Sequence, residues 1–143
     1  MANVVNITLK SPAVGSIICM SNAAYHQRVT IGLPDDTIVF NGSGEQKMMA
    51  MPDGKTHYLL NKYGGDIQVT LTFEYSQSGA EGTYSPAINT RASENDGPTQ
   101  FVYLISSEDA TDDDLNDTFV SINYLMKKPE PVTSGGGTTG SSF

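Results

Sequence analysis

The segment Ile67-Gln68-Val69-Thr70-Leu71-Thr72-Phe73-Glu74-Tyr75 alternates apolar and polar residues along its whole length. Successive side chains of a β-strand point to opposite faces, so this period of two predicts a strand with one face in a core and the other toward solvent. Helical spacing of apolar residues is scarce in the rest of the chain. The segment therefore predicts an all-β fold.

Shorter segments of the same character lie on both sides of this strand, separated by turn-forming clusters of Pro, Asp, Asn and Gly. We expect strands at residues 5–9, 14–20, 28–33, 37–40, 57–60, 101–105 and 118–125. The polar stretch 77–99 is only weakly strand-like, around residues 84–88. About nine short strands at this spacing predict an antiparallel β-sandwich.

The composition changes at Lys127, after which Lys, Pro, Gly, Ser and Thr predominate. Such a segment has almost nothing apolar to bury, so residues 127–143 are expected to form a flexible tail and residues 1–126 a single domain. The single cysteine, Cys19, lies in an apolar run, so it is expected in the core and excludes an internal disulfide framework. Neither a secretory signal nor a transmembrane helix is expected.

The acidity of the chain is concentrated in Glu108-Asp109-Ala110-Thr111-Asp112-Asp113-Asp114-Leu115-Asn116-Asp117, which holds six of the 16 acidic residues. The other ten acids face eight Lys or Arg, so the rest of the molecule is close to neutral despite the net charge of −8. No basic stripe for a nucleic acid is present, and the acidity argues against anionic lipid as a partner. We therefore expect no nucleic-acid partner and no membrane insertion.

Six carboxylates in one loop repel one another, and a hard divalent cation such as Ca²⁺, with six to eight oxygen ligands, would remove this cost. Asp112-x-Asp114-x-Asn116 matches the first three ligand positions of an EF-hand. However, Asp117 replaces the required Gly, Asn123 replaces the required Glu, and the following residues are strand-like, so an EF-hand is rejected. Two adjacent Ca²⁺ ions bridged by Asp114 and Asp117 would use these carboxylates, whereas the alternative is a solvated acidic loop without an ion.

The acidic segment, followed by an apolar strand, resembles the calcium loop of the two-calcium fucose/mannose-binding bacterial lectins. The segment Ser21-Asn22-Ala23-Ala24-Tyr25-His26-Gln27 is similar to a second family feature, an Asn followed by small residues with a Gln just before the next strand. The similarity covers roughly residues 10–76 loosely and 100–125 closely, whereas residues 77–99 are unlike the family.

This resemblance implies two Ca²⁺ ions per chain with a defined set of oxygen ligands. One ion would be held by Glu108, Asp112, Asp114 and Asp117, and the other by Asn22, Asp114, Asn116 and Asp117. The sugar would contact Asn22, Ala23, Ala24, Glu108, Asp109, Asp112, Asp114 and Asp117. Asp109 either accepts hydrogen bonds from the sugar or is a charged group near the site that does not contact the sugar.

The implied function is that of a calcium-dependent lectin that recognises mannose and/or fucose. In the family, Ser directly after the Asn goes with a preference for fucose and Ala with mannose, so Ala23 favours mannose. Tyr25 replaces the usual small residue, and it either stacks on a saccharide unit or points away. The alternative of a different class is a calcium-stiffened structural or adhesive β-sandwich without a sugar site.

The family's homodimer depends on a C-terminal Gly whose carboxylate completes the partner's calcium site. Here Lys127 stands at that place and sixteen residues follow it. Either the site lacks the carboxylate from the partner, or Glu130 or the terminus at Phe143 supplies a substitute. A homodimer is accordingly expected, but without the family's C-terminal Gly.

No enzymatic activity is expected, because His26 and His57 lack a nearby nucleophile motif and no zinc-ligand spacing is present. Glycoside hydrolysis would need one carboxyl group with a raised pKa, whereas calcium would keep these groups ionised. Cytosolic free calcium is expected to be too low to fill a weak surface site. We therefore expect the protein to act outside the cell or at its surface.

Overall fold

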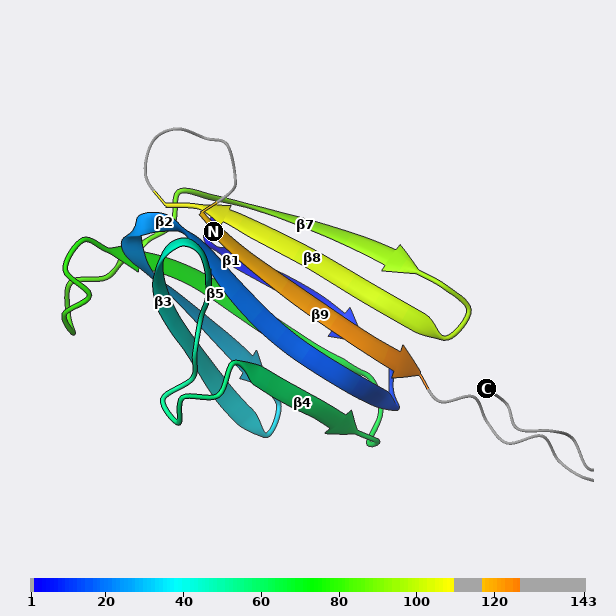
Figure 1. The fold of residues 1–143 in the computed structure, drawn as a ribbon. Coiled ribbons are helices and arrows are strands. Elements are labelled where there is room, and N and C mark those ends of the chain that lie inside the picture. Colours follow the sequence, from blue (N-terminus) through cyan, green and yellow to red (C-terminus); the bar gives the residue numbers. More distant parts are fainter. Residues whose placement is uncertain (1, 110–116, 127–143) are drawn as a thin grey trace, which may run out of the picture.

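The computed structural model describes residues 2–109 and 117–126, which form nine strands and no helix (Figure 1). The strands are β1 (Val4–Leu9), β2 (Ala13–Leu33), β3 (Asp36–Met48), β4 (His57–Lys62), β5 (Ile67–Ser76), β6 (Ser85–Pro86), β7 (Asn89–Asp96), β8 (Gln100–Glu108) and β9 (Thr118–Met126). Every strand pair is antiparallel. The prediction of an antiparallel all-β fold of about nine strands is confirmed.

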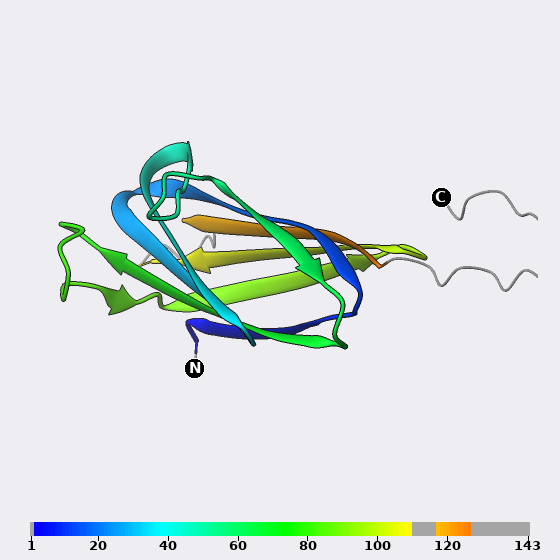
Figure 2. The same cartoon turned by 90° about the horizontal axis from the view of Figure 1, so that it is seen from below.

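Strand β2 is shared by both layers of the fold. The strand order is β1-β5-β2-β9-β8-β7, with β3 and β4 also paired to β2 and with β6 paired to β5. The first part of β2 pairs with β4 and β9, and its last part pairs with β3 and β5. The sheet therefore curves round on itself into a nearly barrel-like sandwich (Figure 2).

The core follows from the period-two pattern. In β5, Ile67, Val69, Leu71 and Phe73 are buried, while the residues between them are exposed or partly exposed. The large apolar side chains that are fully buried are Leu9, Ile17, Ile31, Phe40, Met49, Leu60, Leu71, Phe73, Ile105 and Ile122. Each contributes about 1.5–3 kcal/mol through removal of its surface from water. Cys19 is in the core as predicted, and burial raises the pKa of its thiol.

The expected strand boundaries need three corrections, the first of which is that the strand expected at 37–40 extends to Met48 as β3. The strands expected at 14–20 and 28–33 are one continuous strand, β2, because the residues between them include no Gly or Pro and keep pairing through register shifts. Strand β7 was not expected, because its side chains are almost all exposed and no face of it carries an apolar pattern. It is an edge strand that pairs with β8 through the backbone ladder, and the Ser93 hydroxyl also donates to the Leu104 carbonyl at 3.5 Å.

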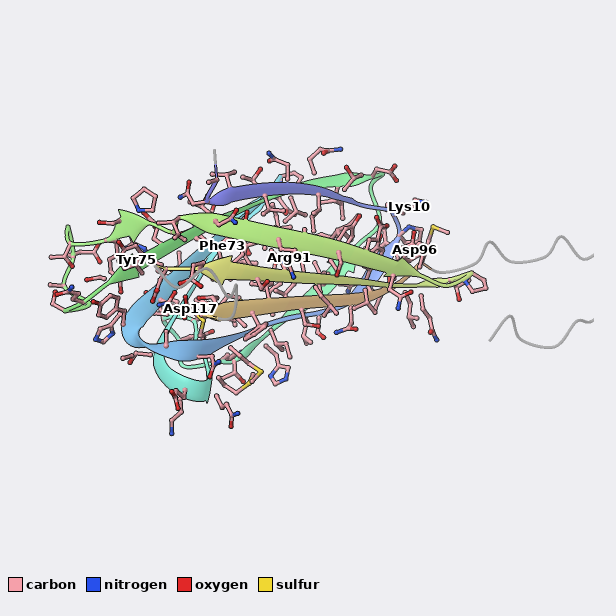
Figure 3. The ribbon with its side chains drawn as sticks, turned by 90° about the horizontal axis from the view of Figure 1, so that it is seen from above. Lys10, Phe73, Tyr75, Arg91, Asp96 and Asp117 are labelled. Atoms are coloured by element: carbon pink, nitrogen blue, oxygen red, sulfur yellow. The ribbon has the colours of Figure 1, made fainter. Side chains whose placement is uncertain are left out.

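Aromatic side chains tie the two layers together at the end of the molecule that carries Lys10 and Asp96 in Figure 3. The Tyr103 hydroxyl donates to the Thr8 carbonyl oxygen at 3.0 Å, and the Lys10 N–H donates to the Tyr124 hydroxyl at 3.0 Å. Burial, followed by the nearby Glu94 carboxylate, raises the pKa of Tyr103 to about 12. This phenol is therefore held in its neutral form.

The expected tail at residues 127–143 lies outside the described residues, so the division at residue 126 stays a prediction. Within the described ranges, the structure contains no helix with the length and apolarity needed to cross a membrane.

Candidate metal and ligand site

Three buried carboxylates meet where β8 ends and β9 begins. Glu108 is the last residue of β8, Asp109 follows it, and Asp117 precedes β9. One oxygen of each lies within 4.8 Å of the others, and the residues are 0%, 7% and 6% exposed respectively. Burying three like charges together is costly unless a cation or protons compensate them. We call these three residues the acidic cluster.

Backbone hydrogen bonds fix the geometry of the acidic cluster. The Asp117 N–H donates to the Ser107 carbonyl at 3.0 Å, which continues the β8–β9 ladder beyond Thr118. The Asp109 N–H donates to Asp117 Oδ2 at 2.9 Å. From β2, the Asn22 N–H donates to the Asp117 carbonyl at 2.8 Å. The structure thus brings together four of the predicted site residues, although their sequence positions span most of the chain.

Gln27 anchors the acidic cluster to the core, a role that the sequence analysis missed. Its side chain is buried at 1% exposure, and Nε2 donates to Asp109 Oδ2 at 3.0 Å. Its Oε1 accepts from Thr118 Oγ1 at 2.8 Å. Gln27 occupies an inward position two residues before the buried Val29. The available signal in the sequence was the position of Gln27, two residues before Val29, which places its amide on the core-facing side of the strand. A buried amide needs polar partners.

The segment after Asn22 is a bulged part of β2 and not a separate loop. Ala23 is half-buried and pairs with Gly44 of β3, and register shifts occur on both sides of it. Ala24 is exposed. A bulge re-aims side chains without ending the strand, so this segment can present Ala23 and Ala24 beside the acidic cluster.

Tyr25 stacks on another ring of the protein. Its ring centroid lies 5.9 Å from that of Tyr75, with 10° between the planes. The Gln77 amide donates to the Tyr25 hydroxyl at 3.0 Å. Figure 3 shows Tyr75 and Asp117 at the same end of the molecule.

The remaining predicted ligands, Asp112, Asp114 and Asn116, lie outside the described residues, so their roles stay predictions. The oxygen atoms of the described site residues fit calcium, which prefers carboxylate and carbonyl oxygens as ligands. Two oxygens on opposite sides of one Ca²⁺ lie about 4.6–5.2 Å apart, twice the usual Ca–O distance. The separation of up to 4.8 Å within the acidic cluster is compatible with a shared ion.

Comparison with known proteins identifies the family. Residues 7–126 match the family model described as fucose-binding lectin II (PA-IIL). No match was found among curated proteins.

Three solved structures have a similar fold. A high-affinity mannose-binding lectin of Ralstonia solanacearum aligns with TM-score 0.62 and 22% identity, over 85% of this chain and 96% of that one. Chromobacterium violaceum lectin CV2L, in complex with alpha-methyl-fucoside, aligns with TM-score 0.62 and 19% identity, over 89% and 99%. The C-terminal domain of the BC2L-C lectin of Burkholderia cenocepacia aligns with TM-score 0.54 and 23% identity, over 87% and 99%. At these identities the alignments show a common fold.

Proposed function

The chain belongs to the fucose-binding lectin II (PA-IIL) family, and we propose that it is a calcium-dependent lectin that recognises mannose and/or fucose through two adjacent Ca²⁺ ions. The observation that carries this proposal is the acidic cluster, three buried carboxylates beside Asn22 at one end of the sandwich. Two fold neighbours support the choice of sugars, since one is described as mannose-binding and the other is in complex with alpha-methyl-fucoside.

The proposed ligand sets follow the family resemblance. Glu108, Asp112, Asp114 and Asp117 would hold one ion, and Asn22, Asp114, Asn116 and Asp117 the other. Bound Ca²⁺ would supply coordination positions at which vicinal sugar hydroxyls replace water. Carboxylates around the ions then accept charge-assisted hydrogen bonds from those hydroxyls. The Gln27 amide holds Asp109 Oδ2 in place for this role.

Sugar preference is proposed to depend on Ala23. This residue has no hydroxyl to hydrogen-bond a sugar, whereas coordination of mannose hydroxyls does not need one. A neutral hydrogen bond contributes about 0.5–1.5 kcal/mol, or roughly two- to tenfold in affinity. Mannose should therefore bind as tightly as fucose or more tightly, and Ala23→Ser should shift the balance toward fucose. Calorimetry with both methyl glycosides on both proteins measures this, and an unchanged ratio would assign selectivity to other residues.

A glycan array with and without a chelator tests the function itself. We expect calcium-dependent signals on mannose- or fucose-containing glycans and loss of those signals in Asp117→Asn. The matched control is Asp53→Asn, which removes one charge from an exposed carboxylate in the turn before β4. Calcium uptake without any glycan signal would instead establish the calcium-stiffened structural module.

Two further parts of the proposal concern where and in what form the lectin works. A homodimer is proposed from the family resemblance, and sedimentation of the full chain measures it. Action outside the cell or at its surface is proposed because a site of this kind needs a calcium-rich medium. Fractionation of the source cells tests that location.

A further inference from the structure

A polar pocket of about 400 Å³ lies between the end of β5 and the segment that returns to β6. It is lined by Tyr75, Ser76, Gln77, Ser78, Thr83 and Ser85. Hydroxyl and amide groups and one aromatic ring make up this lining, without any charged side chain. The volume lies in the range of about 300–1,000 Å³ that is usual for small-molecule sites. We call it the polar pocket.

The polar pocket and the acidic cluster are neighbours through β2. Tyr75 is the register partner of Gln27, which donates to Asp109. Register partners have Cβ atoms about 4.5–5.5 Å apart and share one face of the sheet. Tyr25 stacks on Tyr75 and accepts a hydrogen bond from Gln77. Contacts through Gln27, Tyr75 and Tyr25 thus link the acidic cluster to the pocket.

The segment 85–88, on the β6 side of the pocket, also connects the pocket to the acidic cluster. Ser85 of β6 is the register partner of Tyr75. Three residues later, the Ile88 N–H donates to the Glu108 carbonyl at 2.9 Å. The segment 85–88 therefore borders the pocket at one end and the acidic cluster at the other.

Hydrogen bonds of its lining residues hold the pocket in its shape. The Gly79 N–H donates to Ser76 Oγ at 2.9 Å, and Ser76 Oγ lies 2.6 Å from Thr83 Oγ1. On the outer side, the Arg28 guanidinium lies 3.9 Å from the ring centroid of Tyr84 and pairs with Glu81 at 3.5 Å. A pocket that exists before binding avoids part of the ordering cost of a ligand.

We propose that the polar pocket is a second saccharide subsite, which takes the sugar unit next to the one held at the calcium site. The inference rests on the proposed lectin function. The hydroxyl and amide side chains of the pocket can form hydrogen bonds with the hydroxyls of a neutral sugar. The Tyr75 ring offers an apolar surface on which the C–H groups of one face of the sugar ring can pack. The substrate class is accordingly a neutral oligosaccharide that ends in mannose or fucose.

Calorimetry with methyl α-mannoside and with the α1,2-, α1,3- and α1,6-linked mannobioses tests this proposal in calcium-containing buffer. At least one disaccharide should bind about two- to tenfold more tightly than the monosaccharide, as expected for one added neutral hydrogen bond. Gln77→Ala should remove this gain and leave monosaccharide affinity unchanged. The control Gln68→Ala removes an exposed glutamine at the other end of β5, whose amide oxygen accepts one hydrogen bond from Thr8, and should keep the gain.

The outcomes separate the subsite from the proposed function. Equal affinity for the monosaccharide and every disaccharide would overturn the subsite while the lectin function stands. Calcium-independent binding, or no binding of these probes or of methyl α-fucoside, would overturn the proposed function itself. A Gln77→Ala effect on the monosaccharide, or the same loss in Gln68→Ala, would also refute a separate subsite.

Discussion

Replacing Gln27 by Met should destabilise the protein and weaken sugar binding together. The two side chains have similar length, so Gln27→Met removes the polar contacts of a 1%-exposed residue with little change in packing. The lost bond to the Asp109 carboxylate, at 3.0 Å, involves a charged acceptor and contributes about 1.5–3 kcal/mol. The lost bond from Thr118, at 2.8 Å, is neutral and contributes about 0.5–1.5 kcal/mol.

The free energy of unfolding should therefore fall by about 2–4 kcal/mol, allowing for some relaxation around the buried amide. Urea unfolding in calcium-containing buffer measures this change. At about 3 °C per kcal/mol for a chain of this size, the melting temperature should fall by roughly 6–12 °C. Calorimetry should show weaker mannose binding with calcium uptake retained, because Asp109 loses a group that orients it.

The control is Gln68→Met on β5. Gln68 is exposed and accepts one hydrogen bond from Thr8 Oγ1 at 3.1 Å, so its loss should change stability by no more than about 0.5 kcal/mol. A change below about 0.5 kcal/mol in Gln27→Met itself would refute the argument that this amide anchors the acidic cluster.

Four further predictions concern calcium, ligand roles, packing and pH. Chelation of calcium should lower the melting temperature, because an ion that binds only the folded state stabilises it by about 2.7 kcal/mol at 100 times its Kd, and titration should show two ions per chain. Asp114→Ala should abolish metal and sugar binding, whereas Asp109→Ala should lose sugar binding and retain metal, as calorimetry with each ligand will show. Gly15→Ala should destabilise the protein by about 1–3 kcal/mol or more in urea unfolding, because the added Cβ would lie 1.9 Å from the backbone oxygen of Asn123. The raised pKa of Tyr103, about 12, stabilises the fold below pH 10 and loses this contribution between about pH 10 and 12, so alkaline unfolding should be shallower in Tyr103→Phe.

Each of these predictions has an outcome that contradicts it. Uptake of one ion or none would refute the two-calcium site. Loss of calcium binding in Asp109→Ala would make this residue a metal ligand, which its place in the acidic cluster also permits. Wild-type stability in Gly15→Ala would mean that β2 and β9 separate easily at this position. Identical alkaline profiles for wild type and Tyr103→Phe would assign the pH dependence to other groups.

The fold could be predicted from the sequence where a strand has one buried face. The alternation in residues 67–75 is reproduced by the burial of β5 from Ile67 to Phe73. At Tyr75 the inward position is only half-buried, because the strand has reached the end of the sandwich and the ring stacks on Tyr25. Strand β7 could not be predicted in this way, because an edge strand with both faces exposed needs no apolar residues.

The sequence predicts the chemistry of the candidate site, but it predicts only some of the residues that position its side chains. The residue types of the acidic segment already indicated a hard cation, and the structure places Glu108, Asp109 and Asp117 together. The role of Gln27 could not be assigned, because its partners Asp109 and Thr118 are 82 and 91 residues away in the sequence. The pairing of β2 with β9, and of β9 with β8, brings these groups into contact.

Strand β2 changes layers at the same place at which it contacts the acidic cluster. Strand β2 crosses from one layer to the other between Ser21, which pairs with β9, and His26, which pairs with β5. Asn22 donates to Asp117 just after the last β9 pair, and Gln27 donates to Asp109 just after the first β5 pair. The crossing point therefore joins both sides of the acidic cluster. Any cation that compensates this cluster must also stabilise the closure of the sandwich, so metal binding and folding are expected to be thermodynamically linked.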